Sequence, residues 1–131
     1  MSEETEEGAI ATVRYFIDAL NFAYATTDTK HVRTLFDQSC EFCKPLVENI
    51  DDAKSEGNKF ENYELQIDEI LKSGSMDSEL FAVAANVSQQ PITVLTAAGE
   101  VVRTSDPVTG HRSMFALQYR DGSWMVREIS R

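Results

Sequence analysis

Apolar residues recur every three or four positions in three stretches of the first half of the chain. The longest stretch, residues 9–24, has apolar side chains along one side and polar ones along the other, which predicts a long helix. A short helix is predicted between its capping residue Asp28 and Asp37. A third helix is predicted to begin near Pro45, because proline suits the first helical position, and to end at Gly57.

After the third predicted helix, apolar and polar residues alternate in the manner of β-strands. Residues 63–68 alternate in this way, although their apolar residues also fit a helix, and residues 80–87 are apolar enough for a buried strand. A turn is predicted between them at 73–75. Two hairpins follow, with loops at 97–100 and 121–122. This order predicts an α+β domain in which three N-terminal helices pack on a curved antiparallel sheet.

Composition and charge limit the classes of function. The chain has 131 residues, enough for one domain, which we place at residues 9–131, and 42% of them are hydrophobic. Residues 1–8 are acidic and without periodicity, which indicates a tail or the end of a linker. With 22 acidic and 12 basic residues, the net charge is −10. This charge disfavours binding to nucleic acid and to anionic lipid.

Both cysteines of the chain, Cys40 and Cys43, lie in one turn between two predicted helices. They can form a local disulfide, which is common in exported proteins. A thioredoxin-like redox pair is an alternative, but such a motif follows a buried strand, whereas the residues before Cys40 indicate a helix. Zinc binding needs two further ligands, and His31 and His111 have no recognised spacing for it. Two unpaired thiols are the last alternative, and we expect no metal or cofactor.

The order of the elements and two stretches of sequence resemble known families. The element order and the final hairpin at residues 119–126 resemble the NTF2-like fold, also called cystatin-like or SnoaL-type. Residues 7–24 and the segment SCEFC at 39–43 resemble a family of actinobacterial lipoprotein domains of unknown function. That family implies export and a lipid anchor in the cell envelope, and neither signal is in this sequence. Export implies an oxidising environment, which favours the disulfide between Cys40 and Cys43.

The NTF2-like resemblance also implies an apolar pocket between the long helix and the concave face of the sheet. Asp37 is where the base of a ketosteroid isomerase would lie, and Tyr15 or Tyr24 would donate a hydrogen bond. Taken by themselves, these residues are better explained as a helix-end carboxylate and as aromatic residues at the edge of the core. We assign no catalytic residue. The candidate pocket residues are Tyr15, Tyr24, Phe36, Asp37, Tyr63, Met114 and Trp124.

Three functions from different classes fit these observations. The first, which we prefer, is a non-enzymatic domain of the cell envelope that binds an envelope protein or a small apolar ligand, with the membrane reached only through a lipid anchor. The second is an NTF2-like isomerase or dehydratase acting on a small apolar substrate, which predicts a closed pocket holding a carboxyl group with a raised pKa. The third is a structural module that forms a homodimer through its sheet.

Overall fold

The computed structural model describes residues 4–75 and 79–130, so the first three residues of the predicted tail lie outside it. These residues form an α+β fold in which helices pack against antiparallel sheets, as the sequence predicts. In chain order the elements are α1 (Glu6–Thr26), α2 (Lys30–Arg33), α3 (Cys43–Ser55), β1 (Lys59–Glu61), β2 (Leu65–Ser75), β3 (Phe81–Gln89), β4 (Thr93–Leu95), β5 (Val101–Thr104), β6 (Val108–Arg120) and β7 (Ser123–Ser130).

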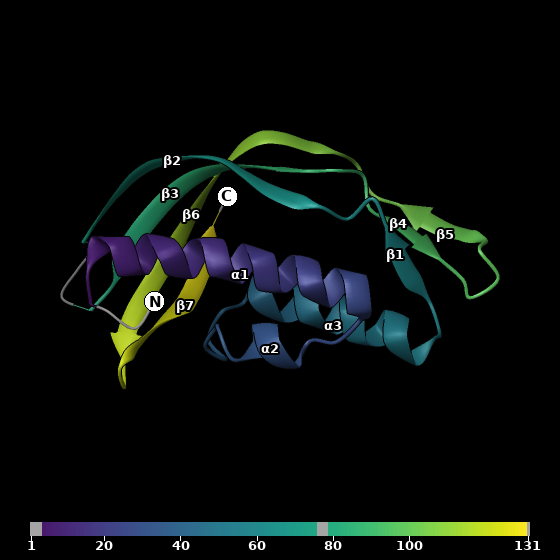
Figure 1. The fold of residues 1–131 in the computed structure, drawn as a ribbon, viewed down its shortest axis with the longest axis horizontal. Coiled ribbons are helices and arrows are strands. Elements are labelled where there is room, and N and C mark those ends of the chain that lie inside the picture. Colours follow the sequence, from purple (N-terminus) through teal and green to yellow (C-terminus); the bar gives the residue numbers. More distant parts are fainter. Residues whose placement is uncertain (1–3, 76–78, 131) are drawn as a thin grey trace.

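Two antiparallel sheets form the β part of the fold. The larger sheet has the order β2-β3-β6-β7, and the smaller has the order β1-β4-β5. Figure 1 shows α1 under the arch of the larger sheet, with α2 and α3 beside it, while the hairpin of β4 and β5 projects from one end. The long helix therefore lies where its apolar side can be covered by the concave face of the larger sheet.

The core forms between α1 and the inner face of the larger sheet. Val13 and Phe16 of α1 are fully or almost fully buried, as are Val83 of β3 and Phe115 of β6, which pair with each other across the sheet. The rings of Phe16 and Phe115 meet edge to face, with centroids 6.5 Å apart. Burying such a side chain contributes about 1.5–3 kcal/mol, so this contact outweighs the modest helix propensity of the aromatic residues.

Helix α1 begins three residues before the predicted start at Ala9. The side-chain oxygen of Thr5 accepts a hydrogen bond from the Gly8 amide at 3.0 Å, which caps the helix. Glu6 and Glu7 then occupy the first turn, where the positive end of the helix dipole stabilises their carboxylates. Periodicity alone missed this start, because the apolar pattern begins later than the cap.

The second and third helices differ from the prediction at their ends. Helix α2 is only four residues long, although the Asp28 carboxylate does accept a hydrogen bond from the Lys30 amide, at 3.0 Å. After the helix, the Val126 amide donates a hydrogen bond to the Leu35 carbonyl, and the Asp37 amide donates one to the Val126 carbonyl. These bonds pair the segment with the edge of β7, so the chain cannot continue as a helix. Helix α3 begins at Cys43, before Pro45. Proline is tolerated there because the first helical amides have no intrahelical partner.

The strand predictions are confirmed in part. Residues 80–87 fall almost entirely within β3, and both hairpins form as antiparallel pairs, β4 with β5 and β6 with β7. The final turn has Asp121 and Gly122 at φ values of 53° and 83°, as a tight hairpin turn requires. The prediction of a turn at residues 73–75 is wrong. These residues continue β2 and pair with residues 81–83 of β3, so cross-strand pairing overrides the local turn preference of serine and glycine.

Candidate functional site

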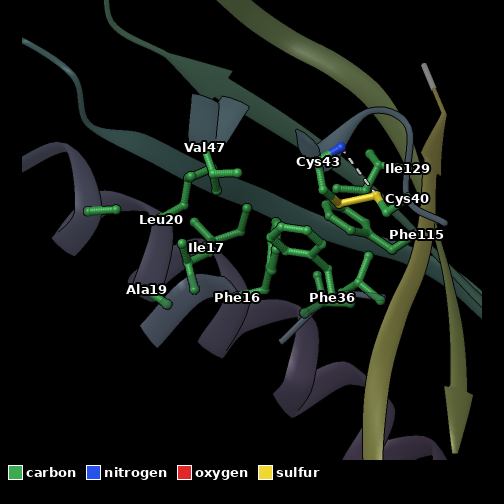
Figure 2. Packing of buried hydrophobic residues seen from close by; sticks show 14 of the residues in the cluster. Phe16, Ile17, Ala19, Leu20, Phe36, Cys40, Cys43, Val47, Phe115 and Ile129 are labelled. Atoms are coloured by element: carbon green, nitrogen blue, oxygen red, sulfur yellow. Dashed lines mark hydrogen bonds between the residues drawn. A yellow bond between two sulfur atoms is a disulfide. The ribbon is translucent and has the colours of Figure 1, made fainter. Parts of the chain in front are cut away.

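A disulfide joins Cys40 and Cys43, whose Cα atoms are 5.3 Å apart. Both residues are almost completely buried. Figure 2 shows the disulfide against Phe115 and Ile129, so it forms part of the core wall between α3 and the sheet. The Cys43 amide donates to the sulfur of Cys40 at 3.2 Å. The pair therefore holds the start of α3 close to the inner face of the larger sheet.

Phe42 lies in the turn between the two cysteines, and the carboxylate of Glu128 in β7 positions its backbone. Oε1 of Glu128 accepts hydrogen bonds from the amides of Phe42, at 3.4 Å, and of Ile129, at 3.0 Å. This contact joins the turn to the edge of the sheet. The disulfide and Glu128 together hold the Phe42 backbone beside the space between α1 and the sheet.

That space contains a small cavity, which we call the inner cavity. Its volume is about 50 Å³, whereas sites for small molecules are commonly about 300–1,000 Å³. Helix α1, the turn with the start of α3, and strands β2, β3, β6 and β7 all contribute to its wall. The lining residues are Phe16, Ile17, Leu20, Tyr24, Phe42, Leu46, Leu65, Val87, Gln89, Ser113, Phe115 and Ile129.

Three polar side chains interrupt this apolar wall. The Tyr24 hydroxyl forms a hydrogen bond with the side chain of Gln89, and burial raises the pKa of Tyr24 despite this bond. Ser113 is only 5% exposed. Ser113 lines the cavity, and among the described residues no fully buried side-chain oxygen or nitrogen lacks a hydrogen-bond partner. The inner cavity therefore offers a hydroxyl and a phenol–amide pair to an occupant.

Acid–base chemistry has little support in this cavity. Among the described residues that line it, none is Asp, Glu, His, Lys or Arg. The raised pKa of Tyr24 keeps its phenol protonated at neutral pH, so it can donate a hydrogen bond but cannot act as a base. Within residues 4–75 and 79–130, no group of three or more His, Cys, Asp or Glu side chains is placed to hold a metal ion.

Asp37, the proposed counterpart of an isomerase base, lies outside the inner cavity. Its carboxylate accepts hydrogen bonds from the side chain of Ser39, at 2.6 Å, and from the Ser39 amide, at 3.0 Å. Arg127 lies 3.6 Å away. The Ser39 hydrogen bonds, with a smaller contribution from Arg127, lower the pKa of Asp37. A carboxyl group that acts as a base near neutral pH needs the opposite shift.

The other predicted pocket residues lie in different parts of the molecule. Only Tyr24 belongs to the wall of the inner cavity, and the Tyr63 ring stacks on it with centroids 6.1 Å apart. Tyr15 forms a hydrogen bond with Nε2 of His31 at the surface. Phe36 lies in the core near the disulfide, as Figure 2 shows.

Met114 and Trp124 lie away from the inner cavity. Met114 borders a separate surface depression with Ala82 and Ala84 of β3. Trp124 packs against Phe81 and Tyr119 at the end of the molecule where α1 begins. The aromatic residues chosen from the sequence therefore support several surfaces rather than one pocket.

The prediction missed Ser113 and Gln89, the other two polar residues of the inner cavity. A signal for Ser113 was present, because it occupies the same strand face as Phe115 and Leu117 in the alternating pattern of β6. A polar residue on an apolar face is more informative than another aromatic residue there. Gln89 gave no comparable signal, since it stands at the end of a strand beside other polar residues.

Comparison with family models places the chain in a family without an assigned activity. Residues 1–130 match the model described as "Family of unknown function (DUF6318)". The chain belongs to this family. No functionally curated protein was found to match it. Within the described part of this DUF6318 member, no helix is both long and apolar enough to cross a membrane.

Solved structures show the fold of this DUF6318 member. The intermembrane space region of the chloroplast protein ARC6 is 14% identical with a TM-score of 0.64, covering 98% of this chain and 96% of that one. An NTF2-like protein of unknown function from Shewanella baltica is 15% identical with a TM-score of 0.51, covering 97% and 94%. A ketosteroid isomerase-like protein from Erwinia carotovora atroseptica is 16% identical with a TM-score of 0.52, covering 95% of both. At these identities the similarity shows an NTF2-like fold alone.

Proposed function

We propose that this DUF6318 member is a non-enzymatic domain that acts outside the cytoplasm, in the cell envelope, and binds a small apolar ligand in the inner cavity. The observation that carries the proposal is the inner cavity itself, whose apolar wall between α1 and the sheet includes the polar side chains of Ser113, Tyr24 and Gln89. A ligand with one polar atom can form a hydrogen bond with Ser113 while its apolar part contacts the surrounding wall.

The volume of the inner cavity limits the size of the ligand. About 50 Å³ holds only a few atoms, so a ligand with a ring must displace part of the wall. Phe42 and Leu46 are the wall residues that can move, because both are only half-buried and both belong to the turn and the start of α3. Rotation of these two side chains toward solvent enlarges the cavity without moving α1 or the sheet.

Binding is better supported than the enzymatic alternative. An isomerase or dehydratase of this fold needs an acid or a base at the reacting atoms, and the described wall of the inner cavity has neither. Asp37, the candidate base, has a lowered pKa and bonds to Ser39. The polar groups that face the cavity can orient a ligand through hydrogen bonds, which is what a binding site requires.

The disulfide supports a location outside the cytoplasm, because disulfides persist in oxidising compartments and are rare in the cytosol. Alkylation followed by intact-mass measurement across a series of thiol buffers tests whether the pair is a stable structural disulfide, on which this argument depends. Because both cysteines are buried, we expect the pair to stay oxidised at a potential of about −250 mV, within the range of the cytosolic glutathione pool. A pair that is already reduced at about −180 mV would contradict a structural disulfide.

The ligand proposal is tested with phenol and benzene, which differ by one hydroxyl group. We expect both to shift the amide resonances of residues around the inner cavity. Phenol should bind roughly 3–10 times more tightly, because its hydroxyl bonds to Ser113. Titrations followed by two-dimensional NMR give both dissociation constants and the location of binding.

Ser113→Ala is the deciding variant, and Ser123→Ala, which removes an exposed hydroxyl from β7, is its matched control. The Ser113 variant should lower the affinity for phenol to that for benzene and leave benzene binding in place. The control should change neither affinity. Shifts confined to the outer surface, or no saturable shift with either probe, would overturn the proposal.

A further inference from the structure

A second cavity, which we call the end cavity, lies where α1 begins, at the end of the molecule opposite the β4–β5 hairpin (Figure 1). Its volume is about 390 Å³. The first turn of α1, the ends of β2 and β3 that face each other, and the hairpin of β6 and β7 contribute to its wall. It shares no lining residue with the inner cavity. It is therefore a separate place for a ligand.

One wall of the end cavity is aromatic. Trp124 packs against Phe81, with ring centroids 5.8 Å apart, and against Tyr119 edge to face, with centroids 5.4 Å apart. Trp124 is only 9% exposed, while Phe81 and Tyr119 are half-buried, and all three line the cavity. Grouped aromatic rings at the border of water and protein attract cations through the negative charge of their faces.

The remaining wall carries negative charge. Glu4, Glu6 and Glu79 line the cavity, and no Lys, Arg or His is among its described lining residues. The Ser73 hydroxyl donates to Oε2 of Glu6 at 2.5 Å, which holds that carboxylate near the end of β2. These carboxylates come from two segments far apart in the chain, and they reverse the preference for anions that the start of a helix has by itself. The net charge of −10 also favours cations.

We propose that the end cavity binds an alkyl guanidinium cation. A guanidinium group is planar and weakly hydrated, so it can stack on an aromatic ring while its edge donates paired hydrogen bonds to a carboxylate. The end cavity combines the two kinds of partner, because aromatic rings and carboxylates line it together. The cation can be a free small molecule or an arginine side chain of another protein. This proposal is independent of a ligand in the inner cavity.

The single tryptophan of the chain provides the measurement, since Trp124 lines the end cavity. Butylguanidinium and its neutral analogue butylurea are titrated at constant ionic strength while tryptophan fluorescence is followed. We expect butylguanidinium to cause a saturable change in the millimolar range and butylurea to bind at least roughly fivefold more weakly. A third titration with the peptide Gly-Arg-Gly identifies the source, because tighter binding than butylguanidinium indicates a protein side chain and weaker binding a free cation.

Two charge-matched variants separate a site from general attraction to an acidic protein. Glu79→Gln removes a carboxylate of the end cavity and should weaken butylguanidinium binding roughly threefold. Glu7→Gln makes the same change in charge at an exposed position of α1 that does not line the cavity, and should leave binding unchanged. Equal binding of butylguanidinium and butylurea, or equal weakening by the two variants, would overturn the proposal.

Discussion

The two cavities of this protein lie against different parts of the same helix and have opposite character. The inner cavity borders the middle and the C-terminal half of α1, holds about 50 Å³ and has an apolar wall with three polar groups. The end cavity borders the first turn of α1, holds about 390 Å³ and combines aromatic rings with carboxylates. The first is shaped by packing and the second by charge at a helix end, so different substitutions should disturb them.

The largest expected effect on stability comes from a substitution that disrupts the packing around the inner cavity. Phe16→Ala should lower the free energy of unfolding by about 3–5 kcal/mol, because it leaves a large void against Phe115. Phe22→Ala removes the same side chain from the same helix where it is 50% exposed, and should change stability by less than about 0.5 kcal/mol. Denaturant unfolding gives both values. Similar losses in the two variants would show that burial against the sheet does not decide the stability of α1.

Removal of the disulfide should have a smaller effect on stability. Replacing both Cys40 and Cys43 by alanine should lower the free energy of unfolding by about 2 kcal/mol, because the loop that the disulfide closes is very short. The change should alter NMR shifts around Phe42 and the inner cavity, while Trp124 fluorescence in the end cavity stays as in the parent protein. A change in Trp124 fluorescence would mean that the two cavities are coupled.

The smallest effect concerns a carboxylate outside both cavities. The pKa of Asp37 is lowered in the folded state, chiefly by hydrogen bonds from Ser39, so its contribution to stability is present above its unfolded pKa of about 4. This contribution disappears as the pH falls through the lower folded pKa. Asp37→Asn should therefore be less stable than the parent near neutral pH, and the difference should shrink in strong acid. Unfolding curves between pH 2 and 7 measure it, and a difference that grows in acid would indicate a raised pKa.

Local signals were sufficient for the elements that depend on neighbouring residues. The apolar spacing of residues 9–24 predicted the body of α1, and the Asp121-Gly122 pair predicted the turn between β6 and β7. In both cases the deciding interactions lie within a few residues. Residues 73–75 show the opposite. Their composition favours a turn, but they form part of a strand because β2 pairs with β3 at nine positions.

The sites were less predictable than the elements. Aromatic residues selected as one pocket are distributed over several surfaces, because the face that each one occupies depends on strand register and on bulges in the sheet. Trp124 stands at the hairpin end of β7, opposite Tyr119, and therefore packs near the end cavity rather than the inner one. The missed residue Ser113 was recognisable only as a polar exception on an apolar face.

The sequence by itself determined the fold class, the long helix, the paired hairpins and an acidic surface, because periodicity, turn residues and charge act over short distances. Only the tertiary structure decided where the cavities lie and what lines them. Phe16 and Phe115 are in contact across the core, and Glu4 and Glu79 line the same cavity, although each pair is far apart in the chain. The volume between such residues depends on how whole elements pack, and no local pattern records it.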